Sequence, residues 1–133
     1  MAGIHPVVRY LIVCDDVVVD PVNPRKVTIV GLISSIRSYD DPPFPVRHKE
    51  LCVYAQLTEF RGRGRVHVDV VHADSEIRAA GTTTCVISFG DNPLEVVGVV
   101  IRIRGCLFPV PGLYHVRLWY NDVVIAEQPL LLR

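Results

Sequence analysis

The chain has 133 residues, half of them hydrophobic and 21% charged, which suits one domain with a sizeable core and excludes a disordered tail. Its 14 basic and 14 acidic residues balance, whereas proteins that hold nucleic acid through its phosphates usually carry a basic excess, so we expect no nucleic-acid partner. No run approaches the roughly 20 apolar residues that span a bilayer, and Arg9, Asp15 and Asp16 interrupt the apolar start, so we expect no membrane partner, no signal peptide and a cytoplasmic location.

Short apolar runs with turn residues between them dominate the chain. The 24 valines favour strands, because β-branched side chains pack well on a pleated surface, and no helix-length window shows a period of 3.6 residues. In chain order, we predict strands at residues 7–14, 26–36, 50–60, 65–73, 76–88, 95–104, 113–120 and 123–132. Residues 1–133 are therefore expected to form a single all-β domain, an antiparallel two-sheet β-sandwich of immunoglobulin-like character with about 7–9 strands.

The segment EFRGRGRVHVDVVHAD (59–74) predicts a hairpin with residues 61–64 as its loop. Strand alternation then sorts apolar pairs onto one face and polar pairs onto the other. The predicted apolar pairs include Leu57–Val68 and Ala55–Val70, and the predicted polar pairs are Thr58–His67 and Gln56–Asp69. The arginines at 61, 63 and 65 are expected to form an exposed, charged tip, although guanidinium groups at this spacing could also clamp a phosphate.

A second hairpin is predicted around Asn121-Asp122, because both residues tolerate the left-handed conformation of a type I′ turn. The expected pairs are Tyr120–Val123, Trp119–Val124, Leu118–Ile125, Arg117–Ala126 and His115–Gln128.

At FPVPGLYHVRL (108–118) a tyrosine follows a proline-bearing loop at the start of a strand. This pattern is typical of the tyrosine corner of immunoglobulin-like sandwiches, in which the hydroxyl bonds back to the preceding loop. We assign that role to Tyr114. Val116 stands where antibody domains have a cysteine, so an antibody-type disulfide is excluded.

Four segments together, YLIVCDDVVVD (10–20), VTIVGLISSI (27–36), FPV (44–46) and FPVPGLYHVRLWYNDVVIAEQPL (108–130), resemble an uncharacterised bacterial family of short β-sandwich proteins found in planctomycete-type genomes and more widely. The resemblance covers most of the chain. It implies a sandwich in a bacterial, intracellular setting, and it supplies no catalytic residue.

The cysteines, Cys14, Cys52, Cys85 and Cys106, are widely spaced without a CxxC pair. We expect four buried free thiols rather than disulfides or a zinc site. His48 and Cys52 share a strand face but lie roughly 13 Å apart along it, at about 3.3 Å per residue. A hydrolase whose Cys-His pair comes from different strands stays as an alternative.

Carboxylates gather in two predicted loops, with Asp15, Asp16 and Asp20 at the first and Asp40 and Asp41 at the second. Aspartate is common in turns because its side chain bonds nearby backbone amides, and we favour this explanation. The alternative is that both loops meet at one end of the sandwich and bind a cation such as calcium or a small ligand. His67 and Asp69 share a strand face, with His72 on the opposite one, and we interpret them as a polar, solvent-facing surface rather than a metal site.

The strand face with Arg117, Trp119 and Val124 has the composition of a protein-binding hot spot, a large aromatic beside a cation and an apolar neighbour. The alternative is that a loop covers Trp119 and makes it part of a secondary core. With Arg61, Arg63 and Arg65 these are the candidate interaction residues. We therefore predict a protein without enzymatic activity or cofactor that binds a partner protein or itself through a sheet face or an edge strand.

Overall fold

A computed structural model describes residues 5–82 and 84–133, and in these the chain forms ten strands. The strands are β1 (Val7–Val19), β2 (Val27–Leu32), β3 (Ser35–Ile36), β4 (Val46–Thr58), β5 (Gly62–His72), β6 (Arg78–Gly81), β7 (Cys85–Gly90), β8 (Val97–Phe108), β9 (Gly112–Tyr120) and β10 (Val123–Leu132). The number of strands in the described residues is thus larger than the predicted number of about 7–9. The apolar runs 26–36 and 76–88 each divide into two strands, the first at residues 33–34, shortly after Gly31, where φ is +66°.

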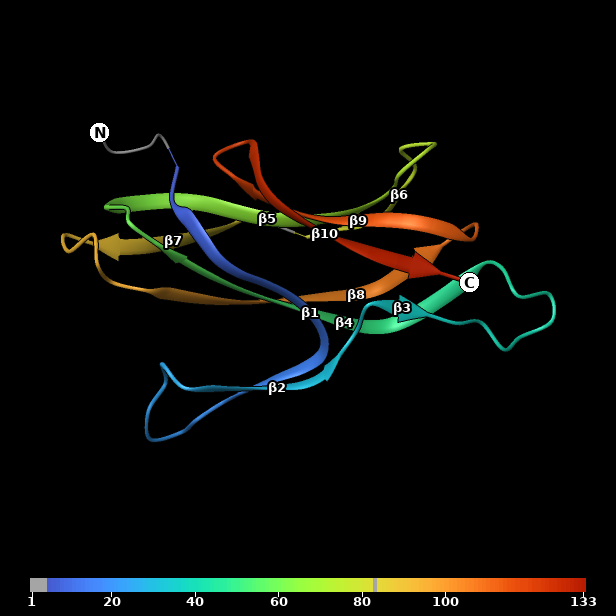
Figure 1. The fold of residues 1–133 in the computed structure, drawn as a ribbon, viewed down its shortest axis with the longest axis horizontal. Helices are drawn as coiled ribbons and strands as arrows, with labels where there is room; N and C mark the ends of the chain where they lie inside the picture. The colour runs from blue at the N-terminus through green and yellow to red at the C-terminus, as the bar shows by residue number, and fades with distance from the viewer. Residues whose placement is uncertain (1–4, 83) are drawn as a thin grey trace.

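The strands form two sheets that pack face to face as a sandwich (Figure 1). One sheet has the order β2-β1-β4-β8, and the other has the order β3-β10-β9-β5-β6, with β7 also paired to β5. The pairings are antiparallel apart from that between β10 and β3, which is parallel. The all-β, two-sheet prediction is therefore confirmed.

The main core lies between the sheets and follows strand alternation. Leu51, Val53 and Ala55 of β4 and Val66 and Val68 of β5 are fully buried. A smaller apolar cluster lies on the outer face of the four-stranded sheet. It consists of Cys14, Val17, Cys52 and Tyr54, with Val27 and Ile29 of the edge strand β2 packed against them. The four-stranded sheet thus has buried apolar residues on both of its faces.

The predicted hairpin at 61–64 is wrong. β4 pairs with β1 and β8 in one sheet, whereas β5 pairs with β9, β6 and β7 in the other. The chain crosses between the sheets after β4, through Glu59 and Gly62, both at positive φ (58° and 79°). Leu57 and Val68 still point inward, because two strands on opposite sides of a core show the same alternation as two strands of a hairpin.

The predicted turn at Asn121-Asp122 is confirmed, since both residues have positive φ (45° and 68°) and Tyr120 pairs with Val123. Beyond Val124 the predicted register is wrong by one residue. A bulge at Ile125 makes Ala126 pair with Leu118 and Glu127 with Arg117. The bulge lies after the turn and does not change which residues the turn requires, so the sequence pattern around Asn121-Asp122 does not predict it.

The hydroxyl of Tyr114 donates a 2.7 Å hydrogen bond to the carbonyl oxygen of Val110, as the tyrosine-corner pattern predicts. The ring is fully buried and meets Phe108 edge-on, with centroids 5.0 Å apart. This bond ties the loop before β9 to the core.

Tyr114→Phe is expected to lower the free energy of unfolding by about 1 kcal/mol, because the hydrogen bond to the Val110 carbonyl is lost while the packing of the buried ring stays. Chemical denaturation of both proteins measures the difference. Tyr39→Phe is the matched control, since Tyr39 is 88% exposed in a loop, and it is expected to change the stability by less than about 0.5 kcal/mol. Equal effects of the two substitutions would contradict the role of the corner.

Candidate functional site

The candidate site is the outer face of the six-stranded sheet, which we call the Arg117–Trp119 face. Alternate residues of β9 point outward there, and the register sets Trp119 between His67 of β5 and Val124 of β10. The same register sets Arg117 between Asp69 and Glu127. Two rows of three side chains therefore cross the centre of the sheet.

Asp69 holds Arg117 in a bidentate ion pair, with Arg117 Nε and Nη2 2.8 and 2.7 Å from the two carboxylate oxygens. The Asp69 side chain is 7% exposed and that of Arg117 27%. Burial by itself raises the pKa of the Asp69 carboxyl, but its neighbours, above all Arg117 through its hydrogen bonds and its charge, together outweigh burial and bring the pKa below its usual range. The indole Nε1 of Trp119 is buried beside this pair and makes no hydrogen bond to the described residues.

Trp119 contacts the ring of His67 and the guanidinium of Arg117. Its ring is nearly parallel to that of His67, at 12° and 5.4 Å between centroids, and the guanidinium carbon of Arg117 lies 5.1 Å from the indole centroid. The side chain is half-buried. A planar guanidinium that stacks on an aromatic ring and also bonds a carboxylate keeps a fixed orientation.

The predicted pairing of His67 and Asp69 with Thr58 and Gln56 is wrong, because Thr58 and Gln56 belong to the other sheet. The predicted solvent-facing position is also wrong for Asp69, which is 5% exposed. The pairs His67–Trp119 and Asp69–Arg117 join strands about 50 residues apart in the chain. The sequence gives one indication of a buried ion pair, which is that the carboxylate of Asp69 stands between two valines in a strand.

The three candidate arginines are exposed and differ in their placement. Arg61 precedes β5, while Arg63 and Arg65 lie within it, where the register pairs them with Ser88 and Val86 of β7. Arg65 is 3.5 Å from the carboxylate of Asp122. The three arginines are therefore not the tip of a hairpin. Arg65 lies two residues before His67 in β5, at the border of the Arg117–Trp119 face.

The aspartates proposed for a cation or ligand site do not come together. The loop after Asp20 and the loop holding Asp40 and Asp41 lie at opposite ends of the molecule in Figure 1. Asp16 is 2.7 Å from Arg102, and Asp20 accepts hydrogen bonds from the backbone of Val22 and Asn23. Within residues 5–82 and 84–133, no cluster of three His, Cys, Asp or Glu side chains is placed to hold a metal.

Three of the cysteines, Cys14, Cys52 and Cys106, are buried free thiols, whereas Cys85 is exposed, which corrects the prediction for that residue. Burial raises the pKa of Cys14 to about 11 and that of Cys106 to about 12. Cys106 pairs with His48 across β4 and β8, but a thiol nucleophile needs a lowered pKa. The raised pKa of Cys106 is thus the opposite of what a nucleophilic thiol requires.

We expect a thiol reagent such as dithionitrobenzoate to modify one thiol of the native protein quickly, that of Cys85, and the other three only after unfolding. Cys85→Ser is expected to remove the fast phase, and Cys106→Ser to leave it unchanged. A fast phase that survives in Cys85→Ser would show that a buried thiol is activated and would favour the hydrolase alternative.

His72 is a buried histidine whose two ring nitrogens both have partners. Nδ1 accepts from the backbone N–H of Ser75 at 3.2 Å, and Nε2 lies 3.3 Å from the carbonyl oxygen of Pro111. These contacts join the turn after β5 to the loop before β9. His72 therefore stabilises the packing of these two loops against each other.

The chain belongs to a family described as a family of unknown function (DUF6941), whose model matches residues 9–133. No curated protein matches it. Among solved structures it is similar to the alkylpurine DNA glycosylase AlkC of Pseudomonas fluorescens bound to DNA with an abasic site analogue, with 12% identity and a TM-score of 0.43. That match covers 92% of this chain and 30% of the glycosylase chain. In the part of the chain that the structure describes, no helix has the length and apolarity to cross a membrane.

Proposed function

We propose that this chain is a non-enzymatic interaction module that binds a partner protein, or a second copy of itself, through the Arg117–Trp119 face. The observation that carries the proposal is the stack of His67, Trp119 and Arg117, with Arg117 fixed by a bidentate bond to Asp69. Tryptophan and arginine are the residues most enriched in interface hot spots.

Preorganisation supports this function. Binding normally costs the rotamer freedom of long side chains at an interface. Here the guanidinium of Arg117 already has one orientation, because Asp69 holds two of its nitrogens and its central carbon lies over the Trp119 ring. A partner that covers Trp119 and Val124 would thus gain apolar area with little ordering cost.

The proposal includes the finer expectations that accompany it. The sandwich is of immunoglobulin-like character, the source is a bacterium of planctomycete type, the protein acts in the cytoplasm and it forms homo-oligomers when no other partner is present. Nucleic acid and membranes are not its partners, in keeping with the balanced charge of the chain.

The test is site-specific photo-crosslinking from position 124, next to Trp119, in the cells that produce the protein, with light scattering of the purified chain beside it. We expect one adduct of discrete mass, either twice the chain or the chain plus one partner, that is lost in Trp119→Ala. Tyr39→Ala, which removes an exposed aromatic elsewhere, is expected to keep it. An absent adduct, or one that persists in folded Trp119→Ala, would overturn the proposal.

A further inference from the structure

Two cysteines are direct cross-strand partners on the outer face of the four-stranded sheet. The register pairs Cys14 of β1 with Cys52 of β4, so both side chains point to the same face. Directly opposed residues of antiparallel strands have Cα atoms about 4.5 or about 5.5 Å apart. Both separations lie within the range of about 4.4–6.8 Å that a disulfide bridges. A bond between the two sulfurs therefore fits the strands as they are.

The two thiols are close neighbours inside the smaller apolar cluster. Sγ of Cys14 donates a hydrogen bond of 3.6 Å to the carbonyl oxygen of Cys52, and both residues are fully buried. Burial, and after it the neighbouring Cys52 thiol, raise the pKa of Cys14 to about 11. Burial raises the pKa of Cys52 as well. In the closed protein both thiols are therefore protonated and shielded from reagents.

The other two cysteines cannot replace a member of this pair. Cys106 pairs with His48, four residues before Cys52 along β4, which is about 13 Å at 3.3 Å per residue and beyond the reach of a disulfide. Cys106 also belongs to the main core between the sheets and not to the outer cluster. Cys85 lies on β7 in the other sheet. The fold thus brings one pair of cysteines together.

The edge strand β2 covers this pair. Val27 and Ile29 of β2 pack against the cluster that contains Cys14 and Cys52. Among the described residues, β2 pairs with β1 alone, and four of its six residues are exposed. Strands with few buried contacts open locally at a smaller free-energy cost than the core strands. A local opening of β2 would expose both sulfurs while β1 and β4 stay paired.

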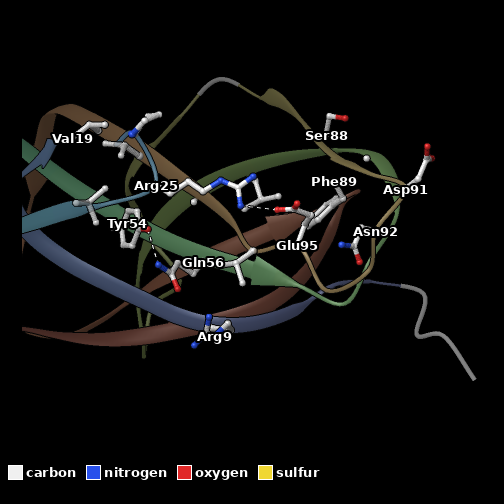
Figure 2. Close-up of a pocket in the computed structure, with 17 residues that line it drawn as sticks. Arg9, Val19, Arg25, Tyr54, Gln56, Ser88, Phe89, Asp91, Asn92 and Glu95 are labelled. Atoms are coloured by element: carbon white, nitrogen blue, oxygen red, sulfur yellow. Dashed lines mark hydrogen bonds and ion pairs between the residues drawn. The ribbon is translucent and has the colours of Figure 1, made fainter. Parts of the chain in front are cut away.

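A groove of about 940 Å³ borders the same cluster (Figure 2). Tyr54, Val27 and Val100 belong both to its lining and to the cluster around the two thiols. The hydroxyl of Tyr54 accepts a 2.9 Å hydrogen bond from Gln56, drawn as a dashed line in Figure 2, so the tyrosine is held in place. Val27 moves with β2, and its displacement would connect the groove to the thiols.

We propose that Cys14 and Cys52 are a dithiol site that a small-molecule disulfide, such as glutathione disulfide, oxidises to a cross-strand disulfide when β2 opens. The thiolate of one cysteine attacks a sulfur of the reagent, which forms a mixed disulfide and releases one glutathione thiolate. The other cysteine loses its proton, attacks the protein sulfur of the mixed disulfide and releases the second glutathione thiolate. The two protein thiols have then lost two electrons and two protons, and the reagent has taken them up as two thiols.

This oxidised state adds to the free thiols of the reduced protein and is independent of the Arg117–Trp119 face. The disulfide would join the two central strands of the four-stranded sheet and close a loop between residues 38 apart in the chain. A disulfide that closes a loop of this length stabilises a fold mainly by restricting the unfolded chain. In a reducing compartment such bonds are usually transient and respond to oxidants.

The test is a long incubation of the folded, full-length Cys85→Ser protein with an excess of glutathione disulfide at neutral pH. The exposed Cys85 is replaced because its thiol would carry a glutathione adduct. Free thiols are then counted in denaturant, and the disulfide is located by mass mapping of peptides. We expect the count to fall from three, the four cysteines less Cys85, to one. The melting temperature is expected to rise by about 10 °C.

Cys106→Ala in the same background is the matched control, since it removes a buried thiol outside the pair, and it is expected to form the disulfide normally. Cys14→Ala is expected to lose it. Val27→Ala, which thins the cover, is expected to form the disulfide several-fold faster. Val97→Ala, which lines the groove but packs on the main core, is expected to keep the parent rate.

Four results would overturn the proposal. They are a count that stays at three free thiols, a disulfide that includes Cys106, an oxidised protein that melts below the reduced one, and equal rates for Val27→Ala and Val97→Ala.

Discussion

Gly64→Ala is expected to lower the free energy of unfolding by about 3 kcal/mol, near the upper end of the usual cost of overpacking a core. A Cβ at this position would lie 2.0 Å from the hydroxyl oxygen and 2.1 Å from Cζ of Tyr120. The tyrosine cannot turn aside, because it is 1% exposed and its ring packs edge-on against Phe60 and Phe89. The second glycine of RGRG is therefore a packing requirement of the core.

Urea denaturation of the variant and the parent measures this loss. Gly62→Ala is the matched control, since it has nothing within 4 Å of the added Cβ and φ of +79°, and its expected cost is about 1 kcal/mol from the left-handed backbone alone. In the double variant Gly64→Ala/Tyr120→Leu the two substitutions are expected to cost less than their sum, because the smaller side chain makes room for the methyl group. A Gly64→Ala variant as stable as Gly62→Ala would contradict the packing role.

Asp69→Asn is expected to lower the free energy of unfolding at neutral pH by about 2 kcal/mol, because Arg117 loses the charge that compensates its partial burial. The pKa of Asp69 is lower in the folded protein than its usual value, so the folded state binds fewer protons than the unfolded chain. The contribution of the ion pair is thus fully present above the unfolded pKa, about 3.9, and is lost as the pH falls through the folded pKa.

The measurement is the difference in unfolding free energy between parent and Asp69→Asn over the range from neutral pH to below pH 3. We expect this difference to be constant down to the unfolded pKa of the carboxyl and to shrink in more acidic solution. Asp16 and Asp20 also have lowered pKa values, but they are present in both proteins, so the difference isolates Asp69. A difference that stays constant through acid would show that the ion pair does not stabilise the fold.

Part of the candidate site could be predicted from the sequence. Strand alternation shows that Arg117 and Trp119 share a face, and the turn at Asn121-Asp122 places Val124 opposite Trp119. The other half of the site comes from β5, which is distant in the chain, and no local pattern relates His67 and Asp69 to β9. The outer face of the four-stranded sheet shows the same limit, because Arg9 is the extra residue of a bulge in β1, and Gly98 leaves room for the side chain of Tyr54, 44 residues earlier in the chain.

Local sequence is enough to predict most of the strands, their inward faces, the turn at Asn121-Asp122 and the Tyr114 corner, because each depends on neighbours within a few residues. Which strands pair depends on the folding of the whole chain. The segment around RGRG illustrates the difference. Its alternation is correct, but the chain crosses from one sheet to the other there. Alternation records which side of a strand is apolar, and an apolar side is buried equally well against a partner in the same sheet or across the core.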